Sequence, residues 1–280
     1  MQGERLPDLT QDETHHDNQI SSKKLAANRF KTALQLGRPL VGIWSMLNST
    51  NVTEGLGWAG FDWLLIDGEH APVSLDNAIS HMRALKGTPT VPIVRLAWND
   101  RILLKRHLDA GADVIMLPYV QNAEEAASAV TFMRYPPLGT RGVAAIHRAS
   151  RYGQIPDYLE RANEELVLIV QVETHEALDK VDEIADVEGV DAIFFGPGDL
   201  AASMGMLGQA GDPAVTAKIN EAMAIVHNSG KKAGVLAPNP TIAAQHIKAG
   251  FDFVSVANDA AILFGSARAI AENFQSLARK

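Results

Sequence analysis

The chain has 280 residues, of which 46% are hydrophobic and 21% are charged, so wholesale disorder is excluded. Its 33 acidic residues outnumber 25 basic ones, and the net charge of -8, without a basic stripe, argues against a nucleic-acid partner. The absence of cysteine excludes disulfides, thiolate metal sites and cysteine nucleophiles, and fits a cytoplasmic location. No segment approaches the ~18 apolar residues of a membrane span, so no membrane partner is expected.

The first 21 residues form a distinct polar segment. They lack the apolar stretch of a signal peptide, and we interpret them as a mobile tail. No break in composition divides the remainder, so residues 22–280 are predicted to form one domain.

From the tail onward, short apolar runs alternate with longer segments rich in Ala, Leu, Glu and Lys. The runs predict strands at 40–46, 61–67, 90–96, 113–118, 166–173, 190–196, 232–237 and 252–257. The segments between and after them predict helices at 75–86, 101–110, 123–134, 174–186, 213–228, 241–249 and 260–279. Eight such units in about 250 residues indicate a (β/α)8 TIM barrel. A doubly wound open sheet is the alternative.

The connection between residues 134 and 165 is unusually long and irregular. Loops of this length are uncommon unless they are functional or disordered. We expect it to lie over the mouth of the active site or in a contact between subunits.

Polar side chains follow several of the predicted strands. In order along the chain they are Asp67, Glu69, His70, Arg95, Gln171, Glu173 and Asp199. Ligands of parallel barrels bind at the carboxyl ends of the strands, so these side chains are predicted to meet at one rim.

Two carboxylates in this set suit a divalent cation. Glu173 and Asp199 follow neighbouring strands, and hard cations such as Mg²⁺ or Mn²⁺ prefer oxygen ligands. Asp199 could also cap a helix beginning at Leu200. Gln171 lies two residues before Glu173 and therefore points the same way, toward a substrate oxygen or into a polar layer of the barrel.

The remaining candidates concern proton transfer and cofactors. His70, beside Glu69, is the best general base. No lysine follows a strand, which disfavours imine chemistry and favours metal-assisted enolisation. The glycines at 196 and 198 match a dinucleotide fingerprint only weakly, because Pro197 removes a donor and Asp199 would repel a pyrophosphate. We therefore expect no organic cofactor.

Four motifs together resemble the HpcH/HpaI family of class II pyruvate aldolases, over about residues 24–270. They are Leu65-Ile66-Asp67-Gly68-Glu69-His70-Ala71-Pro72, Val94-Arg95 with Trp98-Asn99-Asp100, Gln171-Val172-Glu173-Thr174 and Phe195-Gly196-Pro197-Gly198-Asp199-Leu200. The resemblance implies a (β/α)8 barrel, a divalent Mg²⁺, Mn²⁺ or Co²⁺, and reversible aldol reaction of pyruvate or a close 2-oxo acid with an aldehyde. It also implies trimers or hexamers in which the last helix is exchanged between subunits.

The resemblance assigns roles residue by residue. It implies metal ligation by Glu173 and Asp199, and binding of the 2-oxo acid by Gln171 and the backbone at Gly198 and Asp199. It implies that His70 accepts the proton, that Arg95 stabilises the enolate oxygen, and that the acid Asp109 adjusts the basicity of His70. It also matches Trp44 to an aromatic residue near the mouth of the site, and Arg141 to an arginine that reaches an acceptor carboxylate or a neighbouring subunit. Asp67 and Glu69 would lie around the residues that contact the metal and the substrate.

Two other hypotheses about the function stay open. One is a related barrel lyase acting on another acid or on a CoA thioester, like the β-subunit of citrate lyase, although no basic cluster for the CoA phosphates is evident. The other is a protein that binds or assembles without catalysis, which the complete set of site positions disfavours.

Overall fold

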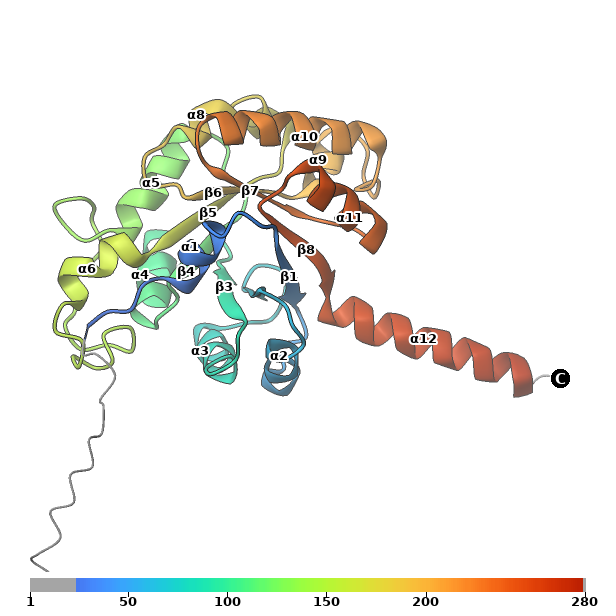
Figure 1. The fold of residues 1–280 in the computed structure, drawn as a ribbon, viewed down its shortest axis with the longest axis horizontal. Helices are drawn as coiled ribbons and strands as arrows, with labels where there is room; N and C mark the ends of the chain where they lie inside the picture. Colours follow the sequence, from blue (N-terminus) through green and yellow to red (C-terminus); the bar gives the residue numbers. More distant parts are fainter. Residues whose placement is uncertain (1–23, 279–280) are drawn as a thin grey trace, which may run out of the picture.

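Eight parallel strands close into a barrel, and each strand pairs with the next one along the chain (Figure 1). The computed structural model describes residues 24–278, so the predicted tail of residues 1–21 lies outside the described residues. The strands are β1 (Leu40–Ser45), β2 (Trp63–Asp67), β3 (Val91–Arg95), β4 (Val114–Leu117), β5 (Val167–Val172), β6 (Ala192–Phe195), β7 (Lys232–Leu236) and β8 (Phe253–Asn258). Since β1 pairs with β8, the (β/α)8 barrel is confirmed and the open sheet is wrong.

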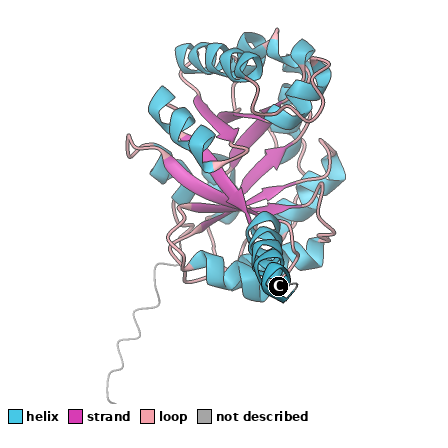
Figure 2. Ribbon diagram, turned by 90° about the vertical axis from the view of Figure 1, so that its right-hand side faces the viewer, coloured by secondary structure: helices cyan, strands magenta, loops and turns pink. Residues whose placement is uncertain are grey.

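Helices surround the barrel (Figure 2). The helices of the described residues are α1 (Arg29–Leu34), α2 (Thr50–Gly57), α3 (Leu75–Ala84), α4 (Arg101–Asp109), α5 (Ala123–Met133), α6 (Tyr158–Glu165), α7 (His175–Leu178), α8 (Val181–Ala185), α9 (Pro197–Ser203), α10 (Pro213–Asn228), α11 (Pro240–Ala249) and α12 (Asp259–Ala278). The helix predicted over 174–186 is divided into α7 and α8. Helices α1, α2 and α6 were not predicted; α2 contains two glycines and β-branched residues, which are weak helix formers.

Large aromatic side chains fill the inside of the barrel. Trp63, Phe194 and Phe253 are fully buried, and the Trp63 ring meets each of the other two edge to face. A Cβ atom at Gly42 would lie 2.0 Å from the Trp63 ring, so only glycine permits this close approach. The barrel is therefore a packed core, and the ligand site must lie at one of its ends.

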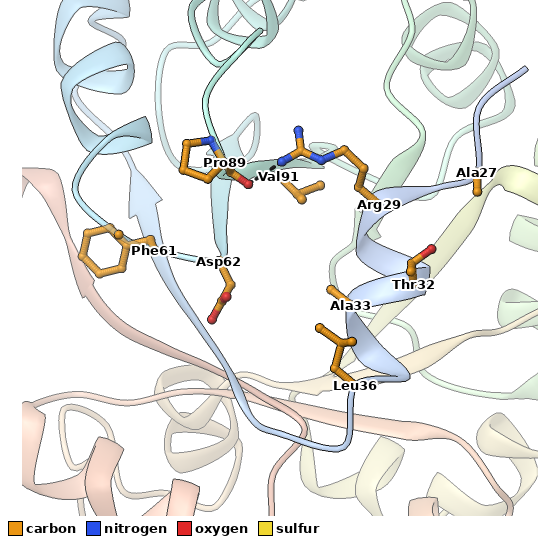
Figure 3. Close-up of a pocket in the computed structure, with 10 residues that line it drawn as sticks. Ala27, Arg29, Thr32, Ala33, Leu36, Phe61, Asp62, Pro89 and Val91 are labelled. Carbon is orange, nitrogen blue, oxygen red and sulfur yellow. Dashed lines mark hydrogen bonds between the residues drawn. The ribbon is translucent and has the colours of Figure 1, made fainter. Parts of the chain in front are cut away.

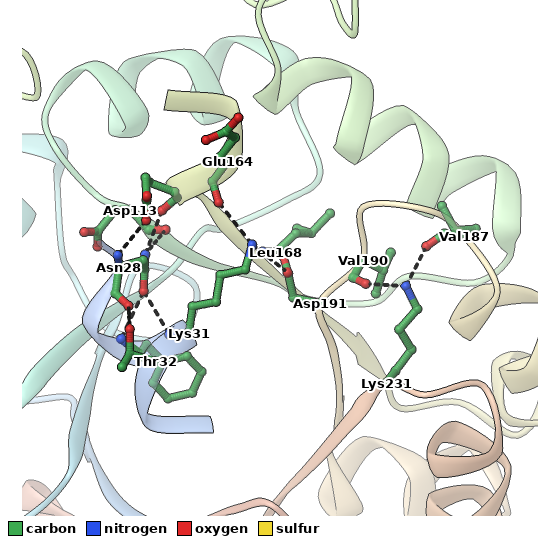
Figure 4. A network of polar contacts seen from close by, with 12 residues as sticks. Asn28, Lys31, Thr32, Asp113, Glu164, Leu168, Val187, Val190, Asp191 and Lys231 are labelled. Atoms are coloured by element: carbon green, nitrogen blue, oxygen red, sulfur yellow. Dashed lines mark hydrogen bonds and ion pairs between the residues drawn. The ribbon is translucent and has the colours of Figure 1, made fainter. Parts of the chain in front are cut away.

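The amino end of the barrel is closed by α1. The Asn28 side chain caps α1 and donates to the carbonyl oxygens of Asp113 and Glu165, and Lys31 donates to that of Glu164 (Figure 4). These bonds tie α1 to the starts of β4 and β5.

A cavity of about 380 Å³ lies beside α1 at this end (Figure 3). Its charged side chains already have partners, because Arg29 donates to the Pro89 carbonyl and Asp62 pairs with Arg38. The cavity is thus a by-product of how α1 packs, away from the polar rim.

The long connection between α5 and α6 also lies toward the amino end. Ala149 donates its N–H to the carbonyl of Asp109, and Arg148 donates to that of Ala110, at the end of α4. Helices of the barrel run back along the strands, so this is the end opposite the carboxyl rim. A position over the mouth of the same chain's site is therefore wrong; a subunit contact stays a prediction.

Helix α12 projects away from the barrel after β8 (Figures 1 and 2). Its first residue, Asp259, is anchored by the N–H groups of Met46 and Leu47. Further along, Phe264, Ile270 and Phe274 are 54%, 60% and 65% exposed. Such exposed apolar surface marks contact sites. Among the described helices, none is both long and apolar enough to cross a membrane.

We predict that Trp63→Ala lowers the free energy of unfolding by about 3–5 kcal/mol, because it opens a cavity in the barrel core. Trp58→Ala is the matched control, since that side chain is 64% exposed, and it should change stability by less than about 0.5 kcal/mol. Urea unfolding followed by circular dichroism measures both. Equal effects of the two variants would contradict the core assignment.

Candidate active site

The carboxyl rim of the barrel brings together the polar side chains that follow the strands. Asp67 and Arg95 are the last residues of β2 and β3, and Gln171 and Glu173 lie at and just after the end of β5. Asp199 lies in the first turn of α9, directly after β6. The expectation that these residues meet at one end of the barrel agrees with their positions.

Asp67 and Arg95 form a buried, two-pronged ion pair. The two residues are register partners in neighbouring strands. Arg95 Nε donates to Asp67 Oδ1 at 2.9 Å, and Arg95 Nη2 donates to Asp67 Oδ2 at 2.7 Å. The side chain of Arg95 is 3% exposed and that of Asp67 is 0% exposed. This paired geometry fixes the plane of the guanidinium group.

The rest of the guanidinium group reaches further site residues. Arg95 Nη1 lies 2.6 Å from Glu69 Oε2 and donates weakly, at 3.4 Å, to Gln171 Oε1. The Arg95 Cζ atom stacks 4.2 Å above the Trp44 ring, which is 5% exposed. Trp44 therefore lies beneath Arg95 in the barrel, rather than at the outer edge of the mouth.

Glu173 is held between two hydrogen-bond donors. The backbone N–H of Tyr119 donates to Oε1 at 2.8 Å, and Gln171 Nε2 donates to Oε2 at 3.0 Å. Burial, the negative charge of Asp199 and that of Glu69 together raise the pKa of Glu173 to about 7. Burial also raises the pKa of Glu69, although Arg95 opposes that shift. Negative charge is thus concentrated here beyond what Arg95 neutralises.

Helix α9 presents Gly198 and Asp199 at the rim. The helix begins at Pro197 with Gly196 as its N-cap, so the interpretation of Asp199 as the cap of a helix beginning at Leu200 is wrong. Both Gly198 and Asp199 are exposed. The Asp199 carboxylate is therefore open to solvent in the first turn of the helix.

The residues present fit a divalent cation. Within residues 24–278 no cluster of three or more His, Asp or Glu side chains is placed to hold a metal, and the candidate set is the pair Glu173 and Asp199. Each Glu173 oxygen accepts one hydrogen bond and keeps a lone pair free. A Cβ atom at Gly196 would lie 2.4 Å from Glu173 Oε2, so the glycine leaves the carboxylate room. Oxygen donors with surplus negative charge are what Mg²⁺ or Mn²⁺ requires.

His70 lies on the loop after β2. Its backbone N–H and that of Glu69 both lie within hydrogen-bond distance of Asp67 Oδ1, at 3.3 and 3.0 Å. The imidazole is 58% exposed, and its Nε2 lies 3.8 Å from Glu69 Oε1. The ring is therefore accessible to a substrate, while Asp67 shapes the loop that carries it.

Asp109 and Arg141 are not brought to this rim within one chain. Asp109 is the last residue of α4, at the opposite end of the helix from the rim. Arg141 Nη2 donates to Asp109 Oδ1 at 2.7 Å, and the guanidinium group stacks 4.4 Å over the Tyr135 ring. Arg141 is buried, and its Nε and Nη1 atoms have no hydrogen-bond partner among the described residues. The two residues instead form a separate ion pair that joins the end of α4 to the long connection, which contains Arg141.

Sequence reasoning missed Tyr119. Its N–H is one of the two donors to Glu173, and its backbone is in the left-handed region, with a φ of 58°. A backbone donor leaves no mark on residue type. The available signal was an aromatic residue directly after a buried strand, at Leu117-Pro118-Tyr119.

We predict that Asp67→Ala lowers the free energy of unfolding by about 3–5 kcal/mol, because it leaves the Arg95 charge buried without its main partner. Arg38→Ala is the control, since Arg38 pairs with Asp62 and its side chain is 53% exposed. That exposed pair is worth at most about 1 kcal/mol. Denaturant unfolding of both variants measures the difference. Similar losses of unfolding free energy would contradict the claim that the buried pair stabilises the fold more than the exposed pair does.

Comparison with known proteins places this site in a family. A family model described as HpcH/HpaI aldolase/citrate lyase matches residues 40–264. A 4-hydroxy-2-oxo-heptane-1,7-dioate aldolase of Escherichia coli is 46% identical over 248 residues, which cover 88% of this chain and 95% of the relative.

Solved structures agree with the sequence match. An HpcH/HpaI aldolase/citrate lyase family protein from Burkholderia cenocepacia is 38% identical, with a TM-score of 0.85 over 89% of this chain and 100% of that one. The citrate synthase SbnG is 26% identical, with a TM-score of 0.80 over 90% of this chain and 99% of that one. The extent of these matches shows that the chain belongs to the HpcH/HpaI aldolase family of carbon–carbon lyases.

Proposed function

We propose that the protein is a metal-dependent class II aldolase that joins pyruvate, or a close 2-oxo acid, to an aldehyde and cleaves the product in reverse. The observation that carries the proposal is the placing of Glu173 and Asp199 beside the buried Arg95 on one rim. The similarity to the Escherichia coli relative supports the same substrate class, a 4-hydroxy-2-oxo acid.

The 2-oxo acid binds against the rim. Glu173 and Asp199 would hold Mg²⁺, Mn²⁺ or Co²⁺, and a bound cation supplies Lewis-acid stabilisation of the enolate worth several kcal/mol. The Gln171 amide lies beside Glu173, to which it donates, and the backbone N–H groups of Gly198 and Asp199 lie in the first turn of α9. Both sets of groups would therefore surround the proposed metal position. These groups orient the carboxylate and keto oxygens of the substrate.

Arg95 stabilises the enolate oxygen. Asp67 and Glu69 fix its guanidinium group before substrate arrives, so no reorganisation is needed when the negative charge develops. Preorganised donors of this kind are worth more in a buried site than in water. Trp44, beneath the guanidinium group, excludes water from its lower face.

His70 takes the proton from C3 of the 2-oxo acid and returns a proton in the reverse reaction. Its exposure leaves it free to contact the substrate. A role for Asp109 in tuning this histidine requires the Asp109 of a second copy, because the two residues lie at opposite ends of one barrel.

Oligomerisation is part of the proposal. The exposed apolar side chains of α12 support a trimer or hexamer that exchanges this helix, and Arg141, within the long connection, would then lie near a neighbouring subunit. A cytoplasmic location stays a prediction, and no specific observation favours a CoA thioester lyase.

The function is tested by cleavage of a 4-hydroxy-2-oxo acid, with released pyruvate measured by a coupled dehydrogenase. We expect cleavage with Mn²⁺ or Mg²⁺ and its loss in EDTA. Glu173→Gln should reduce the rate at least 100-fold, because it removes a charged ligand. Glu164→Gln, on an exposed part of α6, is the control and should retain the rate. Undiminished cleavage by Glu173→Gln would contradict the assigned metal site.

Metal binding should depend on pH. The cation requires the ionised Glu173 carboxylate, whose pKa in the metal-free protein is raised to about 7. The apparent Mn²⁺ affinity should therefore be constant well above pH 7 and fall up to about tenfold per pH unit below it, with a proton released on binding. Titration calorimetry in buffers of different ionisation enthalpy measures both quantities. An affinity independent of pH between 5.5 and 8 would contradict this account.

A further inference from the structure

Two exposed aromatic side chains stack at the carboxyl rim. Trp98 lies on the loop between β3 and α4, and Tyr119 lies on the loop between β4 and α5. Their ring centroids are 6.0 Å apart, with an angle of 27° between the planes. The side chains are 55% and 44% exposed. An aromatic pair left this open to solvent offers a flat apolar surface to a ligand.

The pair lies next to the reacting groups. In the closed barrel β4 lies between β3, which ends in Arg95, and β5, which leads to Glu173. The two loops therefore stand over the stretch of rim between those side chains. The Tyr119 N–H donates to Glu173, so this aromatic residue is hydrogen-bonded directly to the proposed metal ligand.

Hydrogen bonds hold the surface in place. Tyr119 adopts a φ of 58°, which is unfavourable for a bulky residue and persists only where the surroundings enforce it. Its carbonyl accepts from Gln121 Nε2 at 3.2 Å, and Asn99 Nδ2, next to Trp98, donates to the Glu125 carbonyl at 2.9 Å. Strain maintained beside a site indicates a function for the strained residue.

We propose that Trp98 and Tyr119 form the subsite for the acceptor aldehyde and favour aldehydes with an aromatic or extended apolar substituent. The inference rests on the proposed aldolase function. In the addition, C3 of the enolate donates its electron pair to the aldehyde carbon, and the former carbonyl oxygen takes a proton. The substituent of the aldehyde then points out of the barrel, across the two rings.

The test compares kcat/KM for benzaldehyde and glycolaldehyde, each with pyruvate and Mn²⁺, in the full chain. Trp98→Ala removes one ring. Tyr119→Asn removes the other, while asparagine tolerates the left-handed backbone and keeps the N–H to Glu173. We expect each variant to lower the benzaldehyde-to-glycolaldehyde ratio about tenfold, through a higher KM for benzaldehyde. Tyr119→Phe, which keeps the ring, and Trp58→Ala, which removes an exposed tryptophan elsewhere, should leave the ratio unchanged.

Three results would overturn the inference. They are an unchanged ratio in both ring-removing variants, an equal loss with both aldehydes, and a change of oligomeric state in light scattering with the ratio preserved. The last would make the pair a contact between copies of the chain. Failure of the aldolase proposal is distinguishable, because the wild-type protein would then show no EDTA-sensitive reaction with either aldehyde.

Discussion

The buried ion pair between Asp67 and Arg95 is the interaction on which the site depends. Parallel pairing of β2 with β3 places Asp67 and Arg95 in register, and the carboxylate and guanidinium groups meet there in a two-pronged geometry. Gly68 belongs to the same arrangement, because a Cβ atom there would lie 2.6 Å from the Arg95 carbonyl oxygen. A single carboxylate thus fixes both Arg95, which we propose to face the substrate, and the backbone of the loop that carries His70.

The fold and the rim were predictable because their causes are local. Buried parallel strands read as unbroken apolar runs, and a polar residue directly after such a run must lie at the carboxyl end. That reasoning placed Arg95 and Glu173 correctly at the rim. It failed for the donor at Tyr119, because a backbone N–H is independent of residue type. It also failed for α1, whose capping Asn28 bonds to carbonyls more than 80 residues away.

Asp109 shows the limit of reading one chain alone. Motif similarity gives it a role beside His70, yet α4 carries it to the far end of the barrel, where it pairs with Arg141. Asp109 can pair with Arg141 and also lie beside a His70 only if the amino end of one subunit approaches the carboxyl rim of another. The apolar side chains along α12, which the same barrel leaves uncovered, support such an assembly.

The central claim is that this rim enolises a 2-oxo acid, and the most direct test is deuterium exchange at C3 of pyruvate in D₂O, followed by NMR without any aldehyde. The account predicts exchange with Mn²⁺ or Mg²⁺, none in EDTA, and a loss of roughly 100-fold or more in His70→Ala. Exchange that persists in EDTA, or no exchange with pyruvate or hydroxypyruvate under any condition, would contradict it.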